Sequence, residues 1–153
     1  MDSIKKEIIL KISRETAFEK FLTGFNDWWH KEYTWSKDSL KEISIGLQAG
    51  SLCTEIGPNG FRIDWGTVIN IQKDNSLSFK WQIGSNREPI PNPEKASLVT
   101  VTFNPISNSE TKVELTHSDF KSHGDNYLEY LKAMDSNQGW EYLLNRYKEY
   151  AMK

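Results

Sequence analysis

The feature that most constrains the fold is a long alternating stretch from Phe61 to Ile83. In residues 61–72 every second residue is apolar or β-branched, as a strand with one buried face requires. A turn at residues 73–75 follows, and the alternation then resumes. The pattern predicts a β-hairpin with one aromatic face, which other elements must cover. The residues expected on that face are Phe61, Ile63, Trp65, Thr67, Ile69 and Ile71, then Leu77, Phe79, Trp81 and Ile83.

The length of 153 residues predicts a single domain over residues 1–153, large enough to bury roughly 68–70% of its unfolded surface. The chain carries 19 Lys and Arg against 21 Asp and Glu, a formal charge of −2. Because basic residues are not in excess, nucleic acid and membrane surfaces are not expected as partners. Charged residues near the N-terminus interrupt any signal-peptide core, so we expect a soluble, cytoplasmic protein.

Cys53 is the only cysteine, which excludes an intrachain disulfide and a multi-cysteine zinc site and is typical of a reducing compartment. It lies within a predicted strand and away from a helix start, so we expect an inert thiol. No Gly-x-Ser-x-Gly motif for a nucleophilic serine occurs. Three acidic residues in or beside strands, Glu42, Glu55 and Asp64, are expected to face solvent. No cofactor is predicted.

The remaining segments predict an α+β order of strand, short helices, strands and a long C-terminal helix. That last helix is amphipathic, whereas Gly139 argues against its continuity with an earlier helical segment. Of Trp28 and Trp29, one is expected to pack inward and the other to lie at a rim. The expected strands span residues 4–13, 40–46, 51–56, 61–72, 77–83, 98–104 and 111–118, and the expected helices span residues 16–25, 26–30, 127–134 and 140–151.

Residues 86–94 form the clearest predicted loop. Pro89, Pro91 and Pro93 exclude a central strand there and indicate an exposed segment. A loop of this kind at the mouth of a cavity would act as a lid.

A set of tryptophan-containing and strand motifs runs through nearly the whole chain. It comprises Asp27-Trp28-Trp29, Trp65-Gly66-Thr67-Val68, Leu77 to Trp81, Val99 to Phe103, Thr111 to His117, and Gly139-Trp140. The set resembles bacterial relatives of the C-terminal domain of the activator of heat-shock protein 90 ATPase, in the START-like superfamily. The resemblance implies a helix-grip fold, in which an antiparallel sheet of about six or seven strands curves around a C-terminal helix and encloses a cavity. In related superfamily members that cavity takes lipids, sterols, aromatic polyketides or plant hormones.

The aromatic face of the hairpin and the aromatic stripe of the last helix are the predicted walls of this cavity. One aromatic side chain buries about 150–250 Å², which at roughly 25 cal/mol per Å² gives about 4–6 kcal/mol for a tryptophan. Burial in the core would therefore be enough to explain why these aromatic residues are present. The alternative is that they contact a ligand. In that alternative the indole N–H and phenol O–H groups would orient a ligand. The predicted ligand-binding residues are Trp28, Trp65, Phe79, Trp81, Phe103, His117, Trp140, Leu144 and Tyr147.

His117 is the predicted polar member of this set, because it shares a strand face with Val113 and Leu115. A buried imidazole must be hydrogen-bonded, so the residue serves either as a ligand or proton-transfer group or as a satisfied core histidine. Together with Asp119 and His123 it forms a His-x-Asp-x-x-x-His sequence. No metal site is predicted there, because the sequence crosses a strand end and a loop.

Three functions are compatible with these residues. The first, which we favour, is a non-enzymatic START-like module that encloses a small hydrophobic or aromatic ligand. The second follows from the resemblance and is a co-chaperone-like domain that binds heat-shock protein 90 and stimulates its ATPase. The third is an enzyme acting on an aromatic or polyketide-like substrate, which would need His117 paired with an inward carboxylate or tyrosine. We expect a monomer or a weak dimer.

Overall fold

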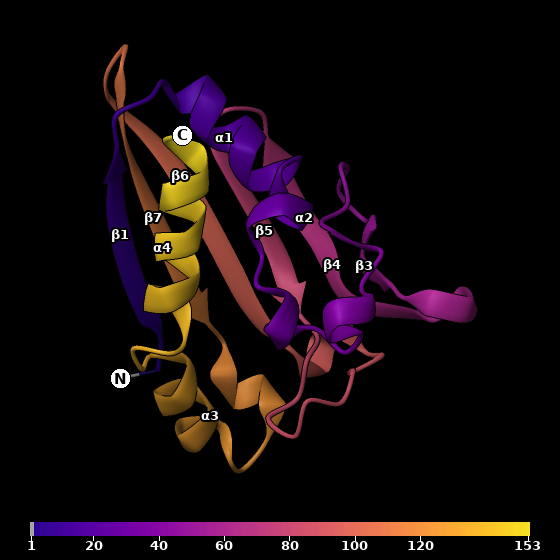
Figure 1. Cartoon of the computed structure of the whole chain (residues 1–153). Helices are drawn as coiled ribbons and strands as arrows, with labels where there is room; N and C mark the ends of the chain where they lie inside the picture. The colour runs from indigo at the N-terminus through magenta and orange to yellow at the C-terminus, as the bar shows by residue number, and fades with distance from the viewer. Residues whose placement is uncertain (1) are drawn as a thin grey trace.

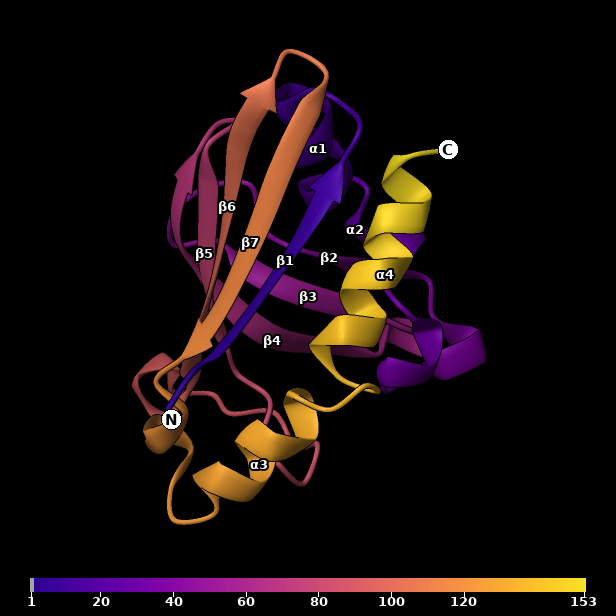
Figure 2. The same cartoon turned by 90° about the vertical axis from the view of Figure 1, so that its left-hand side faces the viewer.

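The computed structural model describes residues 2–153 and contains one antiparallel sheet of seven strands in the order β1-β7-β6-β5-β4-β3-β2. The first and last strands of the chain, β1 and β7, lie side by side (Figure 1). The sheet is strongly curved when seen from its edge (Figure 2). The strands are β1 (Ile4–Leu10), β2 (Glu42–Ser44), β3 (Leu52–Ile56), β4 (Arg62–Gln72), β5 (Ser76–Trp81), β6 (Ser97–Ser107) and β7 (Glu110–Ser118).

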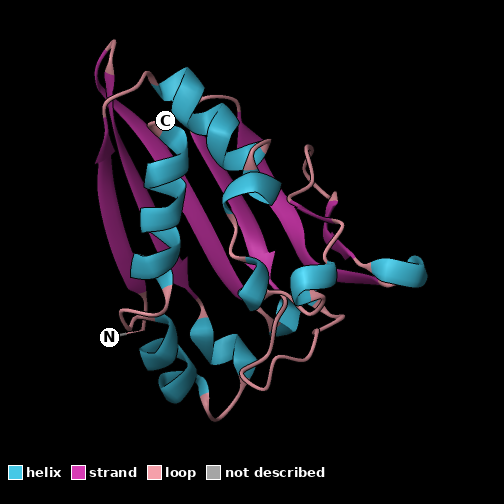
Figure 3. Ribbon diagram, viewed as in Figure 1, coloured by secondary structure: helices cyan, strands magenta, loops and turns pink. Residues whose placement is uncertain are grey.

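The helices α1, α2 and α4 lie on one face of the sheet (Figure 3). α4 runs across this face beside α1 and α2, and α3 lies beyond one end of the strands (Figures 1 and 2). This arrangement confirms the predicted α+β helix-grip fold. No helix among residues 2–153 combines the length and the apolar character that a bilayer crossing requires. The α-helices are α1 (Arg14–Leu22), α2 (Phe25–Trp28), α3 (Tyr127–Met134) and α4 (Trp140–Ala151), and the 3₁₀ helices are η1 (Lys31–Tyr33), η2 (Lys37–Ser39), η3 (Pro58–Gly60), η4 (Pro93–Lys95) and η5 (Phe120–His123).

Both main helices form for reasons visible in the sequence. Ser13 caps α1, because its side-chain oxygen accepts a hydrogen bond from the backbone N–H of Thr16 at 3.3 Å. The apolar stripe of α4 is buried against the sheet and α1, as its helical spacing predicts. The hydroxyl of Tyr147 fixes the contact between these helices by donating to the carbonyl of Ala17 at 2.6 Å.

The long strand β4 departs from the predicted strict alternation. Trp65 has no partner in the register with β3, and Ile69 has none in the register with β5, so each marks a β-bulge. A bulge adds one residue and reverses which face the following residues occupy. Val68 is therefore buried while Ile69 is 46% exposed, the opposite of the prediction, and Thr67 is only half-buried.

The C-terminal helical region is interrupted between Met134 and Trp140. A Cβ atom added to Gly139 would lie 2.0 Å from the carbonyl oxygen of Met134. Only glycine allows so close a backbone approach, and the interruption lets α3 turn away from the axis of α4.

Gly139→Ala is expected to lower the free energy of unfolding by about 2–3 kcal/mol, because the new methyl group meets backbone rather than a flexible side chain. Guanidinium denaturation measures the change. Asn137→Ala, an exposed substitution in the same linker, is the matched control and should shift stability by less than about 0.5 kcal/mol. An unchanged unfolding midpoint for Gly139→Ala would show that the linker opens without cost.

Candidate functional site: an aromatic cavity at one end of the sheet

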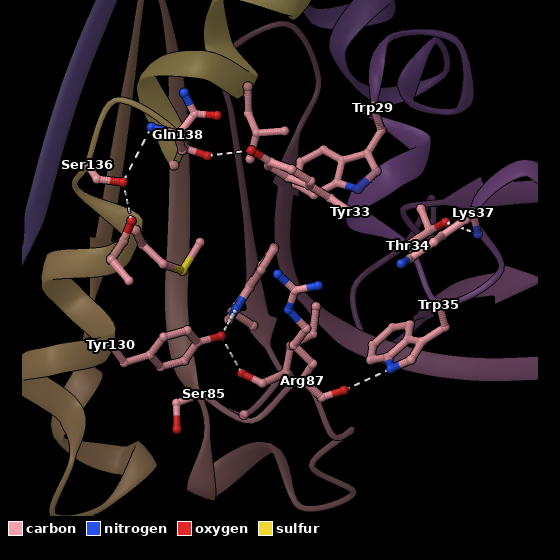
Figure 4. Close-up of a pocket in the computed structure, with 17 residues that line it drawn as sticks. Trp29, Tyr33, Thr34, Trp35, Lys37, Ser85, Arg87, Tyr130, Ser136 and Gln138 are labelled. Atoms are coloured by element: carbon pink, nitrogen blue, oxygen red, sulfur yellow. Dashed lines mark hydrogen bonds between the residues drawn. The ribbon is translucent and has the colours of Figure 1, made fainter.

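A cavity of about 610 Å³ lies at the end of the sheet near α3. Its walls come from the segment after α2, the end of β5 with the loop that follows, α3, and the linker before α4 (Figure 4). Five aromatic residues dominate the walls: Trp29, Tyr33, Trp35, Trp81 and Tyr130. The volume is within the range of about 300–1,000 Å³ that small-molecule sites occupy.

The phenol of Tyr130 connects α3 to the end of β5. Its oxygen accepts a hydrogen bond from Trp81 Nε1 at 2.7 Å and donates one to the carbonyl of Ile83 at 2.6 Å. Burial raises the pKa of Tyr130 to about 12, so the phenol stays protonated and keeps both bonds at neutral pH. Trp81 and Tyr130 therefore present mainly their ring surfaces to a ligand.

Two further hydrogen bonds tie the irregular walls together. Trp35 Nε1 donates to the carbonyl of Arg87 at 2.8 Å, and the Tyr33 hydroxyl donates to the carbonyl of Gln138 at 2.7 Å (Figure 4). These bonds join the segment after α2 to the loop after β5 and to the linker before α4. The indole and phenol groups expected to orient a ligand are thus largely engaged within the protein.

Glu55 anchors the wall segment to the sheet. We expected it to face solvent, but its side chain is completely buried. One carboxylate oxygen accepts from the backbone N–H of Trp35 at 3.1 Å, and the other accepts from the N–H and hydroxyl of Ser36, both at 2.7 Å. The prediction failed because strand alternation does not reveal that a loop folds over this face. Glu42 and Asp64 are exposed, as expected.

A second space of about 10 Å³ lies between Glu55 and several of the aromatic residues that also line the larger cavity. Trp65 borders it, and the indole Nε1 of this residue is buried without a hydrogen-bond partner among the described residues. The volume is about that of one water-sized group.

His117 is completely buried and does not line the cavity. Its Nδ1 accepts a hydrogen bond from Trp140 Nε1 at 2.9 Å, and its Nε2 lies 2.7 Å from the hydroxyl of Ser97. The same hydroxyl lies 2.7 Å from Nε2 of His123. An indole nitrogen only donates, so neutral His117 carries its proton on Nε2 and donates to Ser97, which in turn donates to His123.

This chain of hydrogen bonds contains two neutral imidazoles. Burial, and secondarily the neighbouring His123, hold the pKa of His117 well below its ordinary value of 6.5. Burial also lowers the pKa of His123 to about 4. The direction of the hydrogen bonds favours the same neutral forms, because Nε2 of His123 is used as an acceptor.

The structure separates the predicted site residues into two groups. Trp81 lines the large cavity and Trp65 borders the small one. The other seven lie in the core between the sheet and the helices, and none of them lines the large cavity. They are Trp28, Phe79, Phe103, His117, Trp140, Leu144 and Tyr147.

Several cavity residues were not among those predicted. Trp28 and Trp29 are both buried, at 1% and 5% exposure, and it is Trp29 that borders the cavity. Trp35 comes from a segment without periodicity, so nothing in its spacing marks it. Two signals were available: Arg87 lies in the predicted loop over residues 86–94, and Tyr130 lies in the predicted helix over residues 127–134.

The thiol of Cys53 is buried, and burial raises its pKa to about 12. It is therefore not activated as a nucleophile at neutral pH, in agreement with the expectation from its position in a strand.

Comparison with known families decides the classification. The model of the family described as Activator of Hsp90 ATPase homolog 1-like protein matches residues 12–152. The chain belongs to this family. A comparison with curated protein sequences gives no match.

Solved structures similar to this member of the family cover almost its entire length. The anthrahydroquino-gamma-pyrone synthase Txn09, complexed with SUM, has a TM-score of 0.68 and 25% identity over 98% of this chain and 97% of that one. The self-sacrificing resistance protein CalC from Micromonospora echinospora has a TM-score of 0.65 and 20% identity over 98% and 94%. The Aha1 dimer from Colwellia psychrerythraea has a TM-score of 0.65 and 18% identity over 99% and 97%. The last two likenesses show a shared fold.

Proposed function

We propose that this protein binds a small aromatic or otherwise apolar molecule in the 610 Å³ cavity. The observation that carries the proposal is a wall of five aromatic residues whose polar groups are mostly engaged within the protein. A ligand bound between such walls is stabilised chiefly by burial of its apolar surface, and aromatic stacking adds to this. The similarity to an anthrahydroquino-gamma-pyrone synthase supports an aromatic ligand.

The loop after β5 is the proposed lid of the cavity. It carries Arg87, whose carbonyl accepts the bond from Trp35. Its base is held by the bond from Ile90 N–H to the carbonyl of Gln82, the residue directly after β5, at 2.9 Å. Opening the mouth would break the first of these bonds while the second holds the base of the loop. A ligand could then enter without unfolding of the sheet.

Ligand titration followed by tryptophan fluorescence and thermal shift tests the proposal. Trp29, Trp35 and Trp81 border the cavity, so an aromatic ligand should change their emission. The panel contains fatty acids, sterols, flavonoids and aromatic polyketides. A saturable signal with a raised melting temperature supports the proposal and identifies the ligand class. No saturable change with any compound contradicts it.

A filled cavity gives a sharper test. Ala133→Trp places a large side chain in the cavity and is expected to weaken binding of the neutral fluorescent probe N-phenyl-1-naphthylamine at least tenfold. Leu128→Trp is the matched control, because Leu128 is exposed on the same helix and does not line the cavity. Fluorescence titration measures both affinities. Equal probe affinities in the two variants would place the probe outside the cavity.

Family membership favours a second candidate, binding to heat-shock protein 90. Its test is the ATPase rate of the chaperone with and without this protein. Stimulation that persists in Ala133→Trp would assign the chaperone contact to a surface separate from the cavity.

A further inference from the structure

The mouth of the cavity carries positive charge in a protein whose net charge is −2. Among residues 2–153, its lining includes the two cationic residues Lys37 and Arg87 and no carboxylate. Neither cation takes part in an ion pair within residues 2–153. Both are exposed, so their charged groups are available to a ligand, whereas Trp29 and Trp81 in the same lining are buried.

The carboxylate that anchors the wall segment does not line the cavity with these cations. Glu55 borders only the smaller space, and its two oxygens accept three hydrogen bonds from Trp35 and Ser36. Tyr33, in contrast, is within the electrostatic influence of Arg87: the guanidinium lowers the pKa of its phenol, although burial, the larger effect, raises this pKa overall. Figure 4 shows the side chain of Arg87 extending from its loop into the space between Tyr130 and Trp35.

The backbone at both cations is unusual. Five non-glycine residues in residues 2–153 have positive φ, and three of them are Asn59, Asp74 and Asp119. Asn and Asp tolerate the left-handed region, whereas long side chains are disfavoured there. The remaining two are Lys37, with φ of 49°, and Arg87, with φ of 66°.

Arg87 is the last residue of a tight turn, at a position where the left-handed backbone conformation is usually occupied by glycine. The N–H of Gly84 donates to the carbonyl of Glu88 at 2.8 Å, and the N–H of Arg87 donates to the carbonyl of Gly84 at 2.9 Å. A residue with left-handed conformation completes such three-residue hairpin loops, and glycine is the usual choice. An arginine here costs backbone strain, and residues with such strain cluster at functional sites.

We propose that the cavity takes an amphipathic organic anion, an aromatic body with one acidic group, and that Arg87, assisted by Lys37, binds the acidic group at the mouth. The aromatic body lies inward against Trp29, Trp35 and Trp81. The acidic group is a carboxylate, sulfonate, phenolate or enolate, all of which present oxygen acceptors to a guanidinium. This inference rests on the proposed function and adds the charge of the ligand to it.

Two probes that differ only in a charged group test the inference. 8-Anilinonaphthalene-1-sulfonate is an anion, and N-phenyl-1-naphthylamine is the same ring system without the sulfonate. Arg87→Gln is expected to reduce the affinity for the anionic probe about five- to tenfold and the affinity for the neutral probe less than twofold. Lys37→Gln is expected to reduce the affinity for the anionic probe about two- to threefold. Raising the salt concentration should reduce the affinity of the wild type for the anion more than that of Arg87→Gln.

Arg62→Gln is the matched control, because Arg62 lies outside the cavity and pairs with Asp64. It should leave both affinities unchanged. The carbonyl of residue 87 still accepts from Trp35 in Arg87→Gln, so the loop keeps its anchor. If the neutral probe binds but Arg87→Gln and Lys37→Gln leave the anionic probe unaffected, the inference is overturned and the proposed function stands. If Ala133→Trp changes the binding of neither probe, both the inference and the proposed function fail.

Discussion

Lowering the pH from 7 to 5 is expected to reduce the free energy of unfolding by about 2–3 kcal/mol through two histidines. The folded-state pKa values of His117 and His123 lie below the ordinary value of 6.5, the first far below and the second at about 4. The unfolded chain therefore binds more protons than the folded chain as the pH falls below 6.5. Stability is complete above this pH and declines towards the folded pKa values. His117 alone accounts for about 2 kcal/mol by this linkage, and the contribution of half-buried His123 is smaller because solvent screens it.

Chemical denaturation at pH 7, 6 and 5 measures this loss. His123→Gln removes one of the two imidazoles and should make the decline smaller while the part due to His117 remains, since an amide does not titrate. His30→Gln, at a histidine outside the hydrogen-bonded chain, is the matched control and should retain the decline seen in the wild type. A wild-type stability that stays constant between pH 7 and 5 would contradict the neutral, buried arrangement.

Glu55→Ala is expected to lower the free energy of unfolding by about 3 kcal/mol. It should also reduce the affinity for the neutral probe N-phenyl-1-naphthylamine about tenfold. Removing the carboxylate leaves three donors of Trp35 and Ser36 without their acceptor, and each unsatisfied buried group costs about 1–3 kcal/mol. The affinity falls for a related reason: the wall that contains Trp35 loses its attachment to β3. Guanidinium denaturation and fluorescence titration give the two quantities.

Two further variants serve as comparisons for Glu55→Ala. Glu55→Gln keeps one side-chain oxygen and should show an intermediate loss. Glu42→Ala removes an exposed carboxylate from the adjacent strand and should change stability by less than about 0.5 kcal/mol. Wild-type probe affinity in Glu55→Ala would mean that the wall is held without the carboxylate.

The regular elements were predictable because hydrophobic periodicity determines them. The stripe of α4 follows directly from residue spacing. The bulges at Trp65 and Ile69 were not predictable, since each depends on how neighbouring strands pair rather than on the sequence of β4 itself. Strict alternation therefore assigned Val68 and Ile69 to the wrong faces.

The cavity was harder to predict than the fold. Aromatic residues on regular elements are obvious in the sequence, but in the helix-grip arrangement most of them fill the space between sheet and helices, as Phe103 and Tyr147 do. The cavity forms where irregular segments meet, and Tyr33 and Trp35 carry no periodic signal. Three parts of its lining were marked beforehand: Trp81 on the predicted aromatic face, the predicted loop that contains Arg87, and the predicted helix that contains Tyr130.

The bonds that close the cavity walls have an evolutionary consequence. Trp35 donates to the carbonyl of Arg87, Tyr33 to that of Gln138, and Tyr130 to that of Ile83. Each acceptor belongs to the main chain, so the side chains at positions 83, 87 and 138 can be exchanged while the frame of the cavity is kept. Descendants of such a protein could diversify their ligands by single substitutions at these positions, without first acquiring compensating mutations in the core.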